Sequence, residues 1–202
     1  MNPRLRRDFF ERPTLEVARE LLGQRLVKLD DDGMRISGMI CETEAYIGTE
    51  DDGCHAKAGL TTRNRSMWGP AGFSYVYFTY GMHWMLNLVT ERDGFPAAVL
   101  LRAVSPHEGL ERIRARRARQ PQKRWTDGPA KLCQAFGVHG EHDGLDICIA
   151  DAVIFVEQSQ GIPDSSVTVG PRVGLNRVAE PWKSVPWRFR ASNDDFANRG
   201  GK

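Results

Sequence analysis

The spacing of apolar residues near the start of the chain predicts a first helix. Between Thr14 and Gly23 these residues recur at the spacing of one helix face. Thr14 can cap such a helix and Gly23 can end it, so we predict a helix over 14–22. The apolar face consists of Leu15, Ala18, Leu21 and Leu22.

Residues 34–47 alternate in the manner of a strand with two different faces. One face carries Met34, Ile36, Ile40, Glu42, Glu44 and Tyr46. The two glutamates are unexpected there, because glutamate is a poor strand former and the interior of a sheet disfavours ionised groups. We therefore regard Glu42 and Glu44, beside the ring of Tyr46, as candidates for chemistry.

The middle of the chain predicts a long loop and then a set of antiparallel strands. The loop over 48–72 is polar and contains glycine, and loops of this length in a compact domain are usually functional. Short connections predict a meander whose first two strands form a β-hairpin that turns near Tyr80 and Gly81. The strand-like runs are 73–81, 82–90 and 97–104.

Aromatic residues crowd the predicted hairpin. Filling of the core is one explanation for Tyr75 and Trp84, because aromatic residues favour strands. Tyr80 differs, since it precedes Gly81 at the predicted tip, where a large ring is exposed. An aromatic ring at a rigid tip suits a wedge that enters between stacked bases.

The second half of the chain begins with a helix signal. Ser105 can act as the N-cap, Pro106 suits the first helical position and Glu108 can complete a capping box. We therefore predict a helix over 105–119, and a second helix over 127–137. The residues that bound the second helix are Asp127, Pro129 and Gly137.

The remaining pattern predicts an α+β fold. Two later runs, 146–158 and 167–175, have the composition of strands, and the tail over 191–202 is expected to be loosely ordered. With 202 residues, 41% of them hydrophobic, and without repeats or long linkers, the chain can bury one core. We expect a single mixed domain over 1–202, with an ordered core over about 12–190.

Hydropathy and charge exclude some classes of protein. No apolar run approaches the ~20 residues of a membrane helix, and the N-terminal segment lacks the apolar stretch of a secretion signal. We therefore expect a soluble, cytoplasmic protein that does not enter a membrane. The net charge of +2 does not by itself predict a nucleic-acid binder. Positive charge is concentrated over 112–119 and 121–125, either as a solvated helix face or as a contact with DNA.

The cysteine and histidine spacing argues against a disulfide framework and against a metal site. Four cysteines are scattered without a C-x-x-C pair, which is typical of reduced thiols: Cys41, Cys54, Cys133 and Cys148. His139, His142 and Cys148 are too loosely spaced for a zinc site. The zinc signature of nucleobase deaminases is also absent from the sequence. We expect neither a metal nor a cofactor.

A succession of short segments resembles one known family. The segments are "ETEAYIG", "HAKAG", "RNRSMW", "YVYFTYGMHWMLN", "AAVLLRAVSPHEGLE", "GPAKLCQA" and "RVG". In this order they resemble the alkyladenine (3-methylpurine) DNA glycosylases of the bacterial type, over about residues 12–190. The resemblance implies one domain with a curved antiparallel sheet, surrounding helices and a protruding hairpin. It also implies that a damaged base is rotated out of the duplex into a pocket.

The resemblance assigns residues to that pocket. It places Tyr46 and His55 against one face of the flipped base and Tyr77 against the other. The backbone amide of His55 faces the Hoogsteen edge of the base, and Asn87 stands near the purine C2 position. Tyr80 matches the wedge that fills the gap in the duplex.

The resemblance also assigns the catalytic groups. Glu44 matches the general base that activates water for attack at C1′ of the deoxyribose. Arg102 matches an arginine that holds this water and keeps the carboxylate ionised by lowering its pKa. The backbone carbonyl of Val173 completes the water site. Glu42 has no matching role and is interpreted as structural charge.

Other matching residues imply contacts with DNA phosphates, which position a protein without reading sequence. These are Thr61, Arg63, His83 and Lys131. His83 stands where the family often has tyrosine. Thr79 and Trp84 also depart from the family pattern beside the pocket, which leaves the lesion preference open.

The function implied is that of a monomeric, monofunctional glycosylase. It would remove alkylated or deaminated purines from double-stranded DNA and leave the strand uncut, because no lysine in these motifs is placed as a Schiff-base nucleophile. One alternative is a catalytically silent lesion-binding protein with the same wedge and pocket. Another is an enzyme that cleaves free nucleosides, for which a wedge has no purpose.

Overall fold

β2 (Arg35–Ile47) is the central strand of the sheet in the computed structural model, which describes residues 2–192. The other strands are β1 (Arg25–Leu29), β3 (Ser74–Thr79), β4 (His83–Val89), β5 (Ala97–Glu108), β6 (Ile154–Glu157), β7 (Val167–Gly170) and β8 (Arg188–Ala191). β2 pairs with β5 along one edge, and along the other with β1 near its start and β8 near its end. β4 and β3 extend the sheet beyond β5, β6 lies beyond β1, and β7 lies beyond β8.

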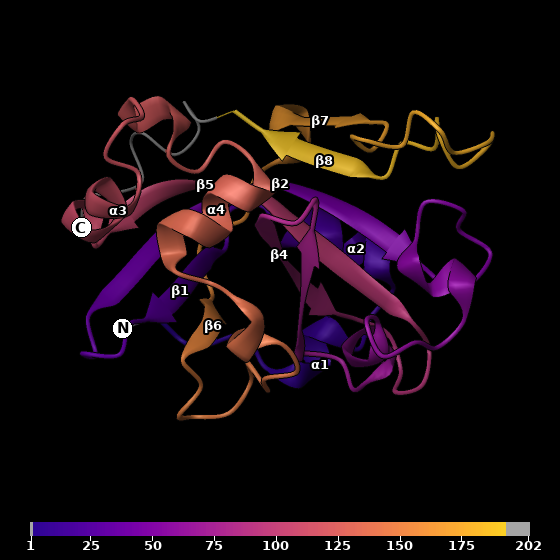
Figure 1. The fold of residues 1–202 in the computed structure, drawn as a ribbon, viewed down its shortest axis with the longest axis horizontal. Helices are drawn as coiled ribbons and strands as arrows, with labels where there is room; N and C mark the ends of the chain where they lie inside the picture. Colours follow the sequence, from indigo (N-terminus) through magenta and orange to yellow (C-terminus); the bar gives the residue numbers. More distant parts are fainter. Residues whose placement is uncertain (1, 193–202) are drawn as a thin grey trace.

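The fold class is α+β, as predicted. Each strand pair in residues 2–192 is antiparallel. Four α-helices surround the sheet in this range (Figure 1): α1 (Arg7–Phe10), α2 (Thr14–Glu20), α3 (Leu110–Arg116) and α4 (Pro129–Phe136).

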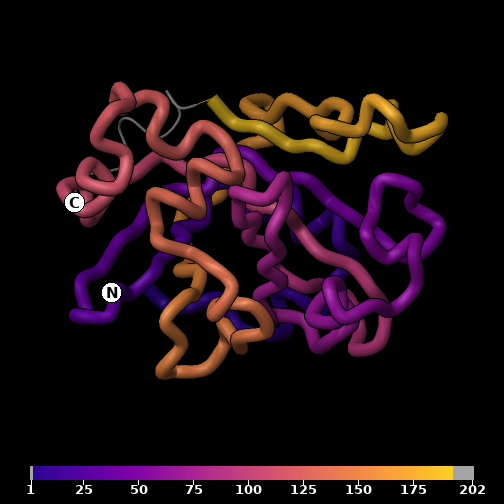
Figure 2. The backbone as a smooth tube through the Cα atoms, in the orientation of Figure 1, coloured from indigo at the N-terminus to yellow at the C-terminus, as the bar shows by residue number. Residues whose placement is uncertain are grey.

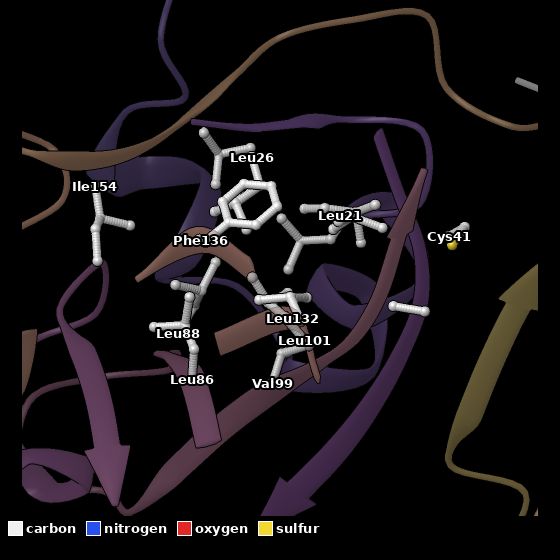
Figure 3. Close-up of a cluster of buried hydrophobic side chains, with 14 of the residues drawn as sticks. Leu21, Leu26, Cys41, Leu86, Leu88, Val99, Leu101, Leu132, Phe136 and Ile154 are labelled. Atoms are coloured by element: carbon white, nitrogen blue, oxygen red, sulfur yellow. The ribbon is translucent and has the colours of Figure 1, made fainter. Parts of the chain in front are cut away.

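The main core joins helices α2 and α4 to the strands that carry the hairpin. Leu21, just after α2, lies with Leu132 and Phe136 of α4 in one cluster (Figure 3). Leu88 of β4 and Leu101 of β5 belong to the same cluster, and these side chains are fully buried. Removing one such side chain from water contributes about 1.5–3 kcal/mol. The core therefore holds β4, β5 and α4 in fixed relation to each other.

Three elements of the pattern are confirmed closely. The strand predicted over 34–47 is β2, and the predicted hairpin is the β3–β4 pair. The helix predicted over 127–137 is α4, which ends at Gly137 in the left-handed conformation, with φ of 67°. Its N-cap is Gly128, however, because the Asp127 carboxylate accepts a hydrogen bond from Lys131 instead of capping the helix.

The capping box predicted at Ser105 is wrong. The segment continues β5 as far as Glu108, and α3 begins at Leu110. The Glu108 carboxylate accepts hydrogen bonds from Arg35 Nε at 2.6 Å and from Ser37 Oγ at 2.5 Å. These contacts with β2 hold the segment extended, so tertiary ion pairing overrides the local helix signal.

Other predicted boundaries also differ. The first helix ends at Glu20, and Thr14 lies inside it, where its hydroxyl donates to Glu91 Oε1 at 2.9 Å. The late strands are shorter than predicted, at Ile154–Glu157 and Val167–Gly170. The elements α1, β1 and β8 were not predicted, because they are short and lack a distinct period.

The basic segment over 112–119 is partly used inside the protein. Arg112 and Arg116 of α3 form ion pairs with Asp30 at 3.4 and 2.8 Å. These contacts attach α3 to the end of β1.

The long loop over 48–72 contains two short 3₁₀ turns, η1 (His55–Ala58) and η2 (Arg65–Trp68). Along another side of the molecule, β7, β8 and the loop between them run beside β2 (Figure 2). The predicted loose tail lies outside the described residues from 193 onwards. Within residues 2–192, no helix has both the length and the apolar character needed to cross a bilayer.

Candidate active site

The two glutamates on β2 lie where its pairing with β5 is irregular. The register shifts on both sides of Glu42, and the shift leaves Arg102 of β5 without a residue directly opposite. Arg102 contacts both carboxylates: Nε donates to Glu42 Oε1 at 2.9 Å and Nη1 donates to Glu44 Oε2 at 3.3 Å. Irregularities of this kind redirect side chains. Here the result is one guanidinium shared by two carboxylates.

Glu44 is fully buried and accepts hydrogen bonds at both carboxylate oxygens. The backbone N–H of Val173 donates to Oε1 at 2.7 Å, and the hydroxyl of Tyr46 donates to Oε2 at 2.8 Å. The structure therefore brings together Glu44, Tyr46, Arg102 and Val173, all of which were predicted from the sequence. Val173 contacts Glu44 through its backbone amide, whereas the family resemblance assigned a role to its backbone carbonyl.

The environment of Glu44 raises the pKa of its carboxyl. Burial is the main cause, while the charge of Arg102, the Val173 amide and the Tyr46 hydroxyl lower the pKa without offsetting burial. The effect expected of Arg102 is therefore present but smaller than the effect of desolvation. A raised carboxyl pKa suits a group that accepts a proton near neutral pH.

Glu42 is paired by two arginines. Besides Arg102, the Nη1 atom of Arg188 on β8 lies 3.5 Å from Glu42 Oε1. These contacts agree with the interpretation of Glu42 as structural charge.

A cavity of about 210 Å³ opens beside this cluster, and tyrosine is the most frequent residue in its lining. Its lining includes the predicted residues Tyr46, His55, Tyr77, Tyr80, Asn87, Arg102 and Val173. Tyr75, Met85 and Pro129 also contribute, and Pro129 is the first residue of α4. The lining thus combines aromatic rings with convergent polar groups, and such a combination is typical of sites that bind and orient a small ligand.

His55 is held in the wall of the cavity as a neutral ring. Its Nδ1 lies 2.8 Å from the Tyr75 hydroxyl, and burial, with Arg63 nearby, lowers the pKa of His55 to about 4. Burial likewise raises the pKa of Tyr77 to about 12. The rings of His55 and Tyr77 meet edge to face with centroids 4.5 Å apart. The two rings therefore touch each other, whereas the sequence expectation placed them on opposite faces of the base.

Asn87 occupies a buried strand position because its side chain has a backbone partner. Its Nδ2 donates to the Tyr75 carbonyl at 2.9 Å, and the two residues are directly opposite each other in the β3–β4 pair. The amide group is thus fixed at the cavity wall.

The turn of the hairpin presents Tyr80 to solvent. The side chain is 81% exposed, and both Tyr80 and Gly81 have positive φ, at 52° and 67°. Two successive residues of this kind form the tight turn that suits the twist of a hairpin. The ring is therefore carried on a rigid support at the mouth of the cavity.

The residues assigned to phosphate contacts lie on three segments of the chain: the loop over 48–72, β4 and α4. Arg63 is exposed; its Nη2 donates to the Phe78 carbonyl at 3.2 Å and its guanidinium lies 5.4 Å from the Tyr77 ring centroid. Thr61 and His83 are also exposed, on the loop and on β4. Lys131 is engaged with Asp127 at 2.7 Å, so a phosphate would have to compete with that carboxylate.

Comparison with known proteins gives the family. A family model described as methylpurine-DNA glycosylase matches residues 8–195. The chain belongs to the methylpurine-DNA glycosylase family. A protein of Methanocella arvoryzae is 45% identical over 198 residues, covering 98% of this chain and 96% of its own. A protein of Chlorobaculum parvum is 43% identical over 185 residues, covering 92% of this chain and 86% of its own. Both relatives are provisionally named 3-methyladenine DNA glycosylases.

Two residues of this methylpurine-DNA glycosylase site were missed in the sequence. Asp51 and Arg172 form a fully buried ion pair beside Tyr46. Arg172 had a signal, because it is the neighbour of Val173 and begins the "RVG" segment. Asp51 stands in an acidic run that resembles a solvated loop, so nothing local marked it.

The loose set of possible zinc ligands does not form a metal site. In the described part of this family member, no three His, Cys, Asp or Glu side chains converge as metal ligands would. His139 and His142 instead contact each other edge to face, with centroids 4.5 Å apart. The Cys148 thiol lies 3.7 Å from the Gly72 carbonyl.

Proposed function

We propose that this protein is a monofunctional DNA glycosylase that removes alkylated and deaminated purines from duplex DNA. The observation that carries the proposal is the buried Glu44 carboxylate beside an aromatic cavity, held by Val173, Tyr46 and Arg102. Family membership supports the coarser conclusion, a methylpurine-DNA glycosylase. The choice of lesions and the residue roles are the finer part of the proposal.

In the proposed reaction, Glu44 acts on a water that attacks the sugar. The water oxygen forms a bond to C1′ as the bond from C1′ to the purine nitrogen breaks, and the electron pair leaves with the base. Glu44 accepts the proton of the water, and its charge also favours the cationic sugar that develops in between. Arg102 and the backbone of Val173 hold the water in this scheme.

The cavity walls suit a purine that carries positive charge. Alkylation at N3 or N7 makes the base cationic and a good leaving group, and tyrosine faces attract a cation by about 0.5–2 kcal/mol per contact. The low pKa of His55 keeps its imidazole uncharged at neutral pH, so it does not repel such a base. Asn87, fixed at the wall, would disfavour the exocyclic amine of guanine.

The exposed ring of Tyr80 suits a wedge that replaces the flipped nucleotide in the duplex. Thr61, Arg63, His83 and Lys131 would contact phosphates of the damaged duplex, which is the proposed partner of a monomeric protein acting on DNA in the cytoplasm. None of the described residues lining the cavity is a lysine. We therefore propose that the enzyme hydrolyses the base from the sugar without cutting the strand.

Single-turnover excision tests this proposal. Duplexes carrying 3-methyladenine, 7-methylguanine, hypoxanthine or ethenoadenine are incubated with excess protein, and released base is measured. Release of at least one base with intact strands is expected. Tight binding without release would favour a silent lesion-binding protein, and release from free nucleosides at equal rates would favour a nucleosidase.

A further inference from the structure

We propose that the buried ion pair of Asp51 and Arg172 is a positioning device that holds the Val173 amide against Glu44. This inference deepens the proposed function and rests on it. Neither residue contacts the substrate in the proposed reaction, and both act through the backbone that they hold. Neither Asp51 nor Arg172 lines the cavity, whereas their neighbours Gly53 and Val173 do.

The pair is bidentate and completely enclosed. Arg172 Nη1 lies 2.5 Å from Asp51 Oδ2, and Nη2 lies 2.7 Å from Oδ1, with both side chains at 0% exposure. A buried pair of this kind is weak evidence for a role in stability, because desolvation of the two charges offsets much of their attraction. The strict geometry of a guanidinium and a carboxylate is better evidence for positional control.

The pair joins three segments that meet at the active site. Arg172 Nη1 also donates to the Ala45 carbonyl on β2 at 3.0 Å, and Nη2 donates to the Trp182 carbonyl at 3.2 Å. The guanidinium lies 4.7 Å from the ring centroid of Tyr46. The segment around 171–175 is therefore attached to β2 at Ala45, which lies between Glu44 and Tyr46.

The loop that leads to His55 is attached to the same pair. Asp51 Oδ1 accepts the Gly53 amide at 2.9 Å. A Cβ at Gly53 would lie 2.9 Å from Arg172 Nη2 and 2.7 Å from Leu175 Cδ1, so any larger residue would have to displace these side chains. The pocket wall and the Val173 loop thus share one anchor.

Side-chain packing contributes little to the position of Val173, because the residue is exposed. Its side chain is 46% exposed, yet its amide donates a 2.7 Å hydrogen bond to a fully buried carboxylate. The residue before it is Arg172, whose position is determined by the ion pair. Loss of the pair would free the Val173 amide to move away from Glu44.

The consequence is a change in the charge state of Glu44. The groups that face its carboxylate are Arg102 on β5, Glu42 and Tyr46 on β2, Tyr77 on β3, the Val173 amide and, through Glu42, Arg188 on β8. Burial already raises the pKa of Glu44, and the Val173 amide is one of the groups that lower it. Without this amide the pKa rises further, so the ionised base is lost at a higher pH on acidification.

The test compares Asp51→Asn with Asp30→Asn. Asp30 is the matched control, because it also forms a buried ion pair: its carboxylate lies 2.7 Å from Lys28 Nζ. This pair lies at the end of β1, and neither residue lines the cavity. Single-turnover excision of hypoxanthine is followed from pH 5 to 9. We expect Asp51→Asn to move the acid limb upward by about one pH unit, the size of effect that loss of a hydrogen bond to a carboxylate produces. Asp30→Asn should leave the limb in place.

An equal loss of rate at all pH values, or an unmoved acid limb, would overturn the proposal. If Asp51→Asn does not fold, the N–H of Val173 can be replaced by oxygen, using the α-hydroxy analogue of valine. This change removes the hydrogen-bond donor without altering any side chain, and it should also produce an upward shift. An unmoved limb in this variant would equally overturn the proposal.

A second readout separates this proposal from the proposed function. The Glu44 carboxyl carbon can be titrated by NMR in the free protein, without DNA. A higher pKa in Asp51→Asn than in the wild type supports the positioning role, even if the wild type excises nothing and the proposed function fails. An unchanged Glu44 pKa contradicts the positioning role, whatever the excision rates are.

Discussion

The backbone amide of Val173 donates a 2.7 Å hydrogen bond to Oε1 of Glu44, although 129 residues separate the two in the chain. Tyr46 and Arg102 meet the other oxygen of the same carboxylate. Each of the three donors lowers the pKa of this carboxyl, although burial has the larger effect and the pKa remains raised. The site is therefore built around one buried carboxylate whose pKa depends on groups from three separate segments of the chain.

Replacing Glu44 by glutamine tests the general base. The amide keeps the shape of the side chain but cannot accept the proton or stabilise a cationic sugar, so excision of hypoxanthine should fall by ~10²–10⁴-fold. Single-turnover rates measure this loss. Excision of 3-methyladenine should fall less, because the cationic base leaves more readily.

The matched control for Glu44 is Glu42→Gln on the same strand. Glu42 is paired with Arg102 and Arg188, whereas Glu44 is the carboxylate that accepts hydrogen bonds from the cavity residues Val173 and Tyr46, so a smaller loss is expected for Glu42→Gln. A Glu44→Gln variant with near wild-type activity on hypoxanthine would show that the catalytic assignment is wrong.

Removing the ring of Tyr80 tests the wedge. Because the side chain is 81% exposed, Tyr80→Ala should change the free energy of unfolding by no more than about 0.5 kcal/mol while weakening binding to lesion duplexes. Thermal unfolding and binding titrations measure the two effects. Tyr80→Gly is the control for the backbone, because glycine accepts the positive φ of 52° without strain. Unchanged binding in both variants would contradict a wedge.

The salt dependence of binding tests the phosphate contacts. Each phosphate neutralised by a side chain contributes about −0.9 to the slope of log K against log salt. Arg63→Gln should reduce the slope by about that amount on every duplex sequence. Arg114→Gln on α3 gives the comparison for the basic segment over 112–119: an unchanged slope would show that the exposed Arg114 is solvated, and a reduced slope would show that it contacts DNA. Equal slopes for wild type and Arg63→Gln would remove Arg63 from the interface.

The buried imidazole of His55 predicts a pH dependence of stability. Burial lowers its pKa in the folded protein to about 4, below the usual 6.5, so the unfolded chain binds the proton more readily. Stability should therefore fall as the pH decreases from about 6.5 to about 4. His55→Gln should show a weaker decline in melting temperature over this range, whereas His83→Gln, at an exposed position, should decline like the wild type.

Local signals determined several features of this protein. Alternation over 34–47 marked β2 together with its two glutamates, and the paired Tyr80 and Gly81 marked the turn of the hairpin. Gly137 ended α4, where the left-handed conformation favours glycine. These features depend on a few neighbouring residues, so they can be read from the order of amino acids alone.

Only the tertiary structure decided how distant charges meet. Glu108 has a helix signal but pairs with Arg35, which lies 73 residues away, and so remains in a strand. The register shift beside Glu42 gives Arg102 its reach to both carboxylates. Asp51 and Arg172, 121 residues apart, become partners because the fold excludes water from both. A charge in the sequence carries no sign of whether it will be buried, and burial is what makes its pairing obligatory.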